Sequence, residues 1–223
     1  MKHVILLGKG ALAVKVADWF LASPDYQLVR VVPNMPESPG FPSLRSWAIE
    51  HQIPWVETGK TDDIPGIHEE GASIDLAVSV TYDKIIKEWF IKKCHKIINI
   101  HNGPLPQYRG VNPVNWALKN GEREHGVTMH DITPGIDDGP IVSQIFFPVN
   151  PEVDEVVDVY ERCLHFGWKL FKETMPTLWE TIPQAQDESH ARYYSKKDFS
   201  GLGERSFFTR QESRAKQQET NTH

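Results

Sequence analysis

The sequence predicts an α/β fold in which a mostly parallel sheet is flanked by helices. Between residues 3 and 100, short apolar runs rich in β-branched side chains alternate with segments of helical periodicity. The connections are short, as in sheets whose two faces are both covered. After residue 110 two alternating runs add a short antiparallel element, and a C-terminal helix and tail follow. The predicted arrangement is Rossmann-like.

The first elements lie in the first 52 residues. Residues 3–8 (HVILLG) are predicted to be a buried strand because the apolar run is too short for a helix. Residues 11–23 carry apolar side chains at helical spacing and stop before a proline. Residues 26–33 are a second β-branched strand, and residues 43–52 form a helix with Ser43 as its N-cap.

The next strands lead to a histidine. Residues 74–80 (IDLAVSV) and 96–100 (KIINI) are predicted strands, with a helix at residues 83–94 between them. His101 directly follows the second of these strands. In open parallel sheets ligands bind beyond the carboxyl ends of the strands, so the fold class alone places His101 at the functional edge.

The C-terminal half begins with a short helix at residues 112–121, closed by a glycine. Residues 125–132 and 141–149 are expected to pair as antiparallel strands on either side of a turn-rich loop. Asn150, followed by a proline and a glutamate, is a typical helix start. We expect this helix to run to about residue 181.

We expect one catalytic domain over residues 1–182 and a short C-terminal extension over residues 183–223. Within the extension, residues 191–202 are expected to form an edge segment. Residues 210–223 have almost no apolar side chains, so this end of the extension is expected to be mobile or to be used only in contacts.

Composition limits the possible functions. The formal net charge of −6 and the 39% of hydrophobic residues are typical of a soluble globular protein. They argue against a nucleic-acid-binding protein, which usually has a basic face. No run is long enough for a membrane-spanning helix, and no signal peptide is visible. Two distant cysteines outside any metal-binding pattern favour free thiols in the cytoplasm.

The loop after the first strand reads GKGALA. It has the outline of a dinucleotide-binding fingerprint between a strand and a helix. The acidic residue that such sites place at the end of the second strand is missing, which argues against NAD. We expect Gly8, Lys9 and Gly10 to hold a phosphate or another edge of a substrate at the helix N-terminus. The alternative is a glycine-rich turn of the kind that many α/β domains need.

Asn99 and His101 are two residues apart in a predicted strand, so their side chains leave the same face. An amide can donate hydrogen bonds to a developing oxyanion, and an imidazole can donate or shuttle a proton. The alternative is a histidine bonded within the protein at a strand end, with Asn99 starting a turn. In the later loop GIDDGP, Asp137 or Asp138 is a candidate to orient the histidine, or belongs to an ordinary Asp-Gly turn.

Together, NIHNGPLPQYRG at residues 99–110 and HGVTMHDITPGIDDGPIV at residues 125–142 resemble the signature of the folate-dependent formyltransferase family. That family includes glycinamide ribonucleotide transformylase, methionyl-tRNA formyltransferase and the N-formyltransferases of nucleotide-linked amino sugars. Its signature is Asn-x-His before a Leu-Pro-x-Tyr-x-Gly-like run, with an aspartate in a later turn. The resemblance implies that Asn99, His101 and Asp137 are the catalytic residues.

The resemblance also implies the reaction, which moves a formyl group from N10-formyltetrahydrofolate to a primary amine without a metal. Asn99 and a protonated His101 would stabilise the oxyanion, and Asp137 would orient the imidazole. The starting protonation state of His101 stays open, because such a histidine can also act as the base. The residues implied to contact the folate are Val80, Tyr82, Asp83, Ile132, Gly135 and Ile136.

The run RGVNPVNWAL resembles the branch of the family that modifies sugars. The implied acceptor is a nucleotide-linked amino sugar, such as a 4-amino-4,6-dideoxyhexose on dTDP, UDP or GDP, in the synthesis of a cell-surface polysaccharide such as O-antigen. A homodimer is expected. The residues expected on the sugar side, besides the loop at residues 34–43, are Tyr108, Arg109, Asn112 and Trp116. For Arg109 a surface position is the alternative, and for Trp116 a core position.

Other functions are weighed against this one. Methionyl-tRNA formyltransferases carry a second, basic domain, which the sequence after the long helix does not resemble. Glycinamide ribonucleotide transformylase has a suitable length, but its phosphate loop is replaced here by GKGALA. A formyltetrahydrofolate deformylase and a non-catalytic nucleotide-binding module are the remaining alternatives.

Overall fold

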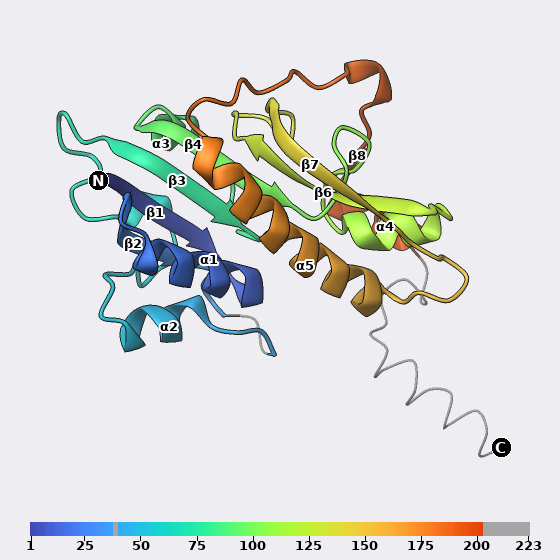
Figure 1. Ribbon diagram of the computed structural model, residues 1–223, viewed down its shortest axis with the longest axis horizontal. Coiled ribbons are helices and arrows are strands. Elements are labelled where there is room, and N and C mark those ends of the chain that lie inside the picture. Colours follow the sequence, from blue (N-terminus) through green and yellow to red (C-terminus); the bar gives the residue numbers. More distant parts are fainter. Residues whose placement is uncertain (38–39, 203–223) are drawn as a thin grey trace, which may run out of the picture.

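The computed structural model describes residues 1–37 and 40–202 and confirms the predicted fold class (Figure 1). One sheet has the strand order β2-β1-β3-β4-β6-β7. Its first four strands in this order are parallel, and β6 and β7 are antiparallel to their neighbours. The strands of this sheet are β1 (Lys2–Gly8), β2 (Tyr26–Pro33), β3 (Ile74–Val80), β4 (Cys94–His101), β6 (Glu124–Asp131) and β7 (Ile141–Pro148).

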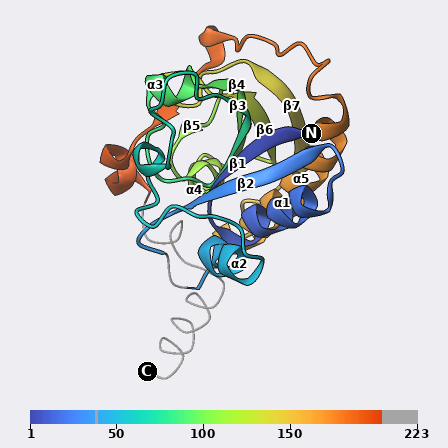
Figure 2. The same cartoon turned by 90° about the vertical axis from the view of Figure 1, so that its left-hand side faces the viewer.

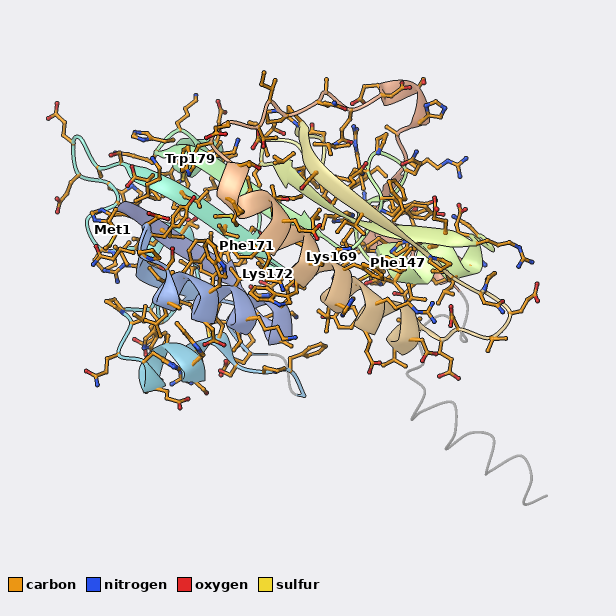
Figure 3. The ribbon with its side chains drawn as sticks, in the orientation of Figure 1. Met1, Phe147, Lys169, Phe171, Lys172 and Trp179 are labelled. Atoms are coloured by element: carbon orange, nitrogen blue, oxygen red, sulfur yellow. The ribbon has the colours of Figure 1, made fainter. Side chains whose placement is uncertain are left out.

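Two long helices cover one face of the sheet. α1 (Gly10–Ala22) and α5 (Val156–Thr174) lie side by side, with α2 (Leu44–Glu50) next to α1 (Figure 2). Phe171 lies where α5 meets α1, and its ring is 5.7 Å from that of Phe20 (Figure 3). This apolar core holds the parallel strands rigidly, which fixes the edge at which they end. None of the described helices is long and apolar enough to cross a membrane.

The opposite face is covered by α3 (Glu88–Ile91) and by a largely irregular segment, residues 51–73, that includes a short 3-10 helix (Thr61–Asp63). Phe90 of α3 is fully buried in a second apolar cluster on this face. Leu7 of β1 and Val32 of β2 belong to the same cluster. Both faces of the parallel strands are therefore buried, as their near-continuous apolar runs predict.

The helix predicted at residues 83–94 is wrong for most of its length, because only α3 is helical. Asn34 is buried, and its side chain donates to the carbonyl of Thr81 at 2.9 Å and accepts from the N–H of Asp83 at 3.3 Å. Thr81 has a φ of +56°, a left-handed conformation that no helix contains. The side chain of Asn34 therefore holds a turn at residues 81–83, where the predicted helix would start.

The predicted start of the long helix at Asn150 is also wrong. Residue 150 lies in a turn, where its N–H donates to the Asp154 carboxylate at 2.7 Å. α5 begins at Val156, because Glu155 and Asp158 form a capping box there. α5 ends at Thr174 and a 3-10 turn (Met175–Thr177) follows, so the helix is shorter than expected. The short helix predicted at residues 112–121 is confirmed as α4 (Pro113–Lys119).

Residues 183–202, here called the C-terminal strap, run back along the molecule towards α4 (Figure 1). In the strap, β8 (Tyr193–Tyr194) pairs in parallel with β5 (Arg109–Gly110), which confirms a paired segment within residues 191–202. The catalytic domain and the extension expected to meet at residue 182 are therefore joined by the pairing of β5 with β8. The mobility predicted for residues 210–223 lies outside the described residues. Two 3-10 helices complete the strap (Glu188–His190 and Lys196–Gly201).

Candidate active site

The carboxyl ends of the parallel strands form one edge of the sheet, and the three residues expected to be catalytic meet there. Asn99 and His101 leave β4 at its end, and the loop between β6 and β7 brings Asp137 towards them. The Oδ2 atom of Asp137 lies 3.6 Å from Nδ1 of His101. Asp138 instead accepts a hydrogen bond from the hydroxyl of Thr133, so Asp137 is the carboxylate that faces the imidazole.

The orientation of His101 follows from the loop after its strand. Nε2 of the imidazole lies 2.7 Å from the carbonyl oxygen of Tyr108. A carbonyl only accepts, so Nε2 donates and carries a proton. The ring therefore presents Nδ1 to Asp137, and Nδ1 is the nitrogen that can gain or lose a proton at the site. His101 is only 7% exposed, so its orientation is held by the protein rather than by solvent.

Asp137 is held as an anion. The N–H of Gly110 donates to Oδ2 at 2.8 Å, and Oδ1 lies 3.5 Å from Nε2 of His130. Burial by itself raises the pKa of the Asp137 carboxyl, but the charge of His101 and the hydrogen bond from the N–H of Gly110 outweigh it. The pKa of Asp137 is therefore well below its usual range, and the group is ionised at neutral pH.

His130 joins this cluster, although the sequence analysis gave it no role. Its Nδ1 lies 2.8 Å from the carbonyl oxygen of Asp131 and therefore donates to it. Nε2 then accepts from the side-chain N–H of Asn99 at 3.1 Å. A primary amide has two such donors, so this bond orients Asn99 and leaves it one N–H to offer a ligand. The alternating sequence of β6 was visible, but only its pairing with β4 shows that His130 lies opposite Asn99.

Two cavities meet at these residues. The Ile136 cavity, of about 330 Å³, extends along residues 82–86 and 132–137. The Asn112 cavity, of about 380 Å³, extends along residues 99–102 and 110–115, and His101 lies in its wall. Two ligands that filled both cavities would be in contact at the cluster. The residues that line both cavities are Tyr82, Asp83, Asn99, Gly110, Val111 and Asp137.

The Ile136 cavity contains most of the residues expected to contact a folate. Ile85 and Ile136 line it although they are 78% and 46% exposed, so the cavity offers unusually bare apolar side chains. Val80 does not line it, since this residue is fully buried below the turn. Tyr82 is fixed by a hydrogen bond from its hydroxyl to the carbonyl of Gly59 at 2.8 Å. The predicted residues that do line it are Tyr82, Asp83, Ile132, Gly135 and Ile136.

Lys9 connects the Asn112 cavity with a third one. The Phe41 cavity, of about 330 Å³, is lined by Gly8, Lys9 and part of the loop at residues 34–43. Lys9 also lines the Asn112 cavity. Gly10 lines none of these three cavities, and its N–H donates to the carbonyl of Pro42 at 3.2 Å. One backbone N–H at the N-terminus of α1 is therefore already hydrogen-bonded within the protein.

Of the four residues expected on the sugar side, only Asn112 lines a cavity next to the cluster. Tyr108 is buried, and its hydroxyl donates to Glu122 at 2.6 Å. Trp116 is buried and stacks on Tyr194 with ring centroids 4.6 Å apart. Arg109 is also buried, with its guanidinium bonded inside the protein. These contacts give Tyr108, Arg109 and Trp116 structural roles and do not support the expected substrate contacts.

His125 does not belong to the cluster. Its Nε2 donates to the carbonyl of Asn102 at 2.9 Å, and burial lowers its pKa to about 4, so the ring is neutral. Within residues 1–37 and 40–202, no group of three or more His, Cys, Asp or Glu side chains is arranged to hold a metal ion.

Comparisons with known proteins agree on one family. A family model described as formyl transferase matches residues 67–175. WlaRD, a sugar 3N-formyl transferase crystallised with dTDP and 5-N-formyl-THF, superposes with a TM-score of 0.76 at 30% identity, covering 89% of this chain and 71% of that one. The N-formyltransferase of Helicobacter canadensis, in complex with folinic acid and dTDP-3-aminofucose, gives a TM-score of 0.74 at 29% identity, covering 89% and 72%.

The curated relatives carry a different name. Methionyl-tRNA formyltransferase of Bacteroides fragilis is 28% identical over 200 residues, which cover 82% of this chain. The chain spans 60% of the length of that relative.

Proposed function

Because the chain belongs to the folate-dependent formyltransferase family, we propose that it transfers a formyl group from 10-formyltetrahydrofolate to the amino group of a nucleotide-linked amino sugar. The observation that carries this proposal is the meeting of the Ile136 and Asn112 cavities at Asn99 and Asp137. Group transfer needs a donor and an acceptor held in contact, and two joined cavities with polar groups at the junction provide this arrangement.

The residues of the Ile136 cavity fit a folate. The bare side chains of Ile85 and Ile136 would be covered by a flat ring system, which removes apolar surface from water. Asp83 and Asn99 in the same cavity supply hydrogen-bonding groups to orient it. A bound folate would supply the formyl group at the junction, next to the Asn112 cavity.

The cluster residues can stabilise the charge that develops during transfer. When an amine attacks a formyl carbon, negative charge grows on the formyl oxygen. The second N–H of Asn99 and a proton on Nδ1 of His101 would donate hydrogen bonds to that oxygen. Asp137 is ionised beside Nδ1, so it stabilises a positive imidazole and keeps the ring oriented.

The acceptor class is supported by the position of Lys9. Its side chain lies between the Asn112 cavity, which contains His101, and the Phe41 cavity. An ammonium group between two cavities suits a diphosphate that joins a sugar to a nucleoside. We assign the sugar to the Asn112 cavity, where its amine would reach the cluster, and the nucleoside to the Phe41 cavity.

A second candidate is methionyl-tRNA formyltransferase, which the names of the curated relatives favour. The formal charge of −6 opposes it, because tRNA binding normally needs a basic surface. The resemblance of this chain to solved sugar N-formyltransferases, which extends over more than two thirds of their length, favours the amino sugar.

One assay separates these functions. The protein is mixed with 10-formyltetrahydrofolate and tetrahydrofolate formation is followed with dTDP-, UDP- or GDP-linked amino sugars, with methionyl-tRNA, or with no acceptor. We expect turnover that depends on one of the amino sugars. Turnover only with methionyl-tRNA would show the second candidate to be right, and turnover without an acceptor would indicate a deformylase. No tetrahydrofolate formation under any condition would favour a non-catalytic binding module.

The variant His101→Ala is the matched control for this assay. We expect it to lose formyl transfer and to keep folate binding, because His101 lines the Asn112 cavity and not the Ile136 cavity. The expected homodimer, the cytoplasmic location and the role in a cell-surface polysaccharide such as O-antigen remain predictions. Light scattering tests the first of these, and a monomer at assay concentration would contradict it.

A further inference from the structure

Asp137 is also held by its backbone. The side-chain amide nitrogen of Gln186, in the C-terminal strap, donates to the carbonyl oxygen of Asp137 at 2.8 Å and to that of Gly139 at 2.7 Å. Asp137 has a φ of +52°, which is costly for a residue with a side chain. Such a conformation persists only where the surrounding contacts enforce it. Both N–H donors of Gln186 act on this one turn.

Arg109 fixes which way the amide of Gln186 points. The buried guanidinium donates to Oε1 of Gln186 from Nε at 3.0 Å and from Nη2 at 2.8 Å. A guanidinium has no acceptor, so the amide oxygen must face Arg109 and the NH₂ group must face the turn. On its outer side Arg109 forms a bidentate salt bridge, in which Nη2 and Nη1 donate to the carboxylate of Glu188 at 2.6 and 3.0 Å. Glu188 therefore bonds to Arg109, whereas Gln186 bonds to the Asp137 turn.

The carboxylate end of Asp137 depends on the same segments. Gly110, whose N–H binds Oδ2 of Asp137, has a φ of +92°. A Cβ atom there would lie 2.1 Å from the carbonyl oxygen of Tyr194 in the strap, so only glycine allows this approach. The strap therefore controls both the backbone and the carboxylate of Asp137.

We propose that Gln186 is a positioning residue for formyl transfer: its amide, oriented by Arg109, holds the backbone of Asp137 so that the carboxylate faces Nδ1 of His101. The inference rests on the proposed function for its catalytic consequence. Gln186 lines none of the three cavities, so it reaches the site only through the turn at residues 137–139. A substitution there changes kcat and leaves substrate binding in place.

Two variants separate positioning from simple anchoring of the strap. Gln186→Glu keeps an oxygen that accepts from Arg109, so the strap stays attached to Arg109. It removes both N–H donors from the turn at residues 137–139. Glu188→Ala weakens the anchor on its exposed side and keeps the amide of Gln186 on the turn. We expect Gln186→Glu to lower kcat by about 10- to 100-fold, since small misplacements of a reacting group have such effects. KM values for both substrates stay within about threefold of the wild type.

For Glu188→Ala the expected result is reversed: a lower melting temperature with kcat within about twofold of the wild type. Gln186→Ala, which introduces no new charge, should lower kcat in the same way as Gln186→Glu and covers the case in which the glutamate variant does not fold. If both Gln186 variants keep the kcat of the wild type, the inference is overturned. It is also overturned if kcat in all three variants simply follows the melting temperature.

A second readout does not depend on turnover. The amide of Gly110 is bonded to Asp137, so a displaced aspartate exposes it to solvent. Hydrogen exchange at Gly110 should be faster in Gln186→Glu and unchanged in Glu188→Ala. Unchanged exchange in Gln186→Glu would overturn the inference. If the wild type transfers formyl groups to no acceptor, the proposed function fails, and exchange at Gly110 still decides whether Gln186 positions Asp137.

Discussion

Asp137→Asn is expected to lower kcat for formyl transfer by about 10²- to 10³-fold with little change in KM. The substitution keeps the size of the side chain and its ability to accept from the N–H of Gly110. It removes the negative charge that lies 3.6 Å from Nδ1 of His101. The variant therefore tests charge at the cluster with little change in packing.

The magnitude follows from the distance. Two unit charges 3.6 Å apart attract by about 5 kcal/mol at an effective dielectric constant of about 20. The side chains of His101 and Asp137 are 7% and 15% exposed, so water screens them little. If the imidazole is positive in the transition state, up to about 5 kcal/mol is lost, which corresponds to roughly 10³- to 10⁴-fold. Residual hydrogen bonding by the amide reduces the loss.

The measurement is steady-state folate turnover with the amino sugar that proves active, and Asp138→Asn is the control. Asp138 is the neighbouring carboxylate and is bonded to Thr133, so its variant should keep kcat within about threefold of the wild type. Equal losses in the two variants, or an Asp137→Asn enzyme with more than a tenth of the wild-type kcat, would refute the electrostatic role given to Asp137.

Asp137 should also affect stability in acid. Its pKa is lower in the folded protein than in the unfolded chain, so the carboxylate stabilises the fold above the ordinary carboxyl pKa of about 3.9. That contribution is lost as the pH falls through the lower, folded-state pKa. In urea unfolding, the wild type should exceed Asp137→Asn in stability at pH 7, and the difference should shrink below about pH 4. A difference independent of pH would contradict this.

Three further substitutions test other parts of the site. His130→Ala should lower kcat about tenfold, because Asn99 loses the acceptor that orients its amide, and an unchanged kcat would exclude that role. Lys9→Ala should raise KM for the sugar nucleotide about tenfold or more at constant kcat, whereas Lys15→Ala, on the exposed side of α1, should leave KM unchanged. Gly8→Ala should destabilise the fold by about 3 kcal/mol or more, because its Cβ would lie 1.8 Å from a carbonyl oxygen at the end of β3; a melting curve like that of the wild type would disprove this close approach.

The parts of the fold that local sequence determines were predictable. Residues 74–80 match β3 without error, because a short apolar run between polar segments has no other stable arrangement in a parallel sheet. Two of the wrong helix starts depend on a few polar side chains. Asn34 holds the turn at the start of one predicted helix through a contact with Asp83, 49 residues along the chain, and the Glu155 capping box delays the start of the other.

The site was predictable where spacing carries the information. Asn99 and His101 share a face because they are two apart in a strand, and the family resemblance added Asp137. The role of His130 depends on its pairing with Asn99 across β4 and β6, which no local pattern reveals. Arg109 looked like a substrate contact because its partners in the strap lie 77 and 79 residues further along the chain.

The strap has a consequence for the order in which the site is completed. Gln186 reaches Asp137 across 49 residues and Arg109 across 77, and closing such long loops costs entropy before any contact is gained. During synthesis Asn99, His101 and Asp137 leave the ribosome before Gln186 does, because chains grow from the N-terminus. A nascent chain that ends after α5 therefore contains every residue of the catalytic cluster but lacks the segment that holds the aspartate in place.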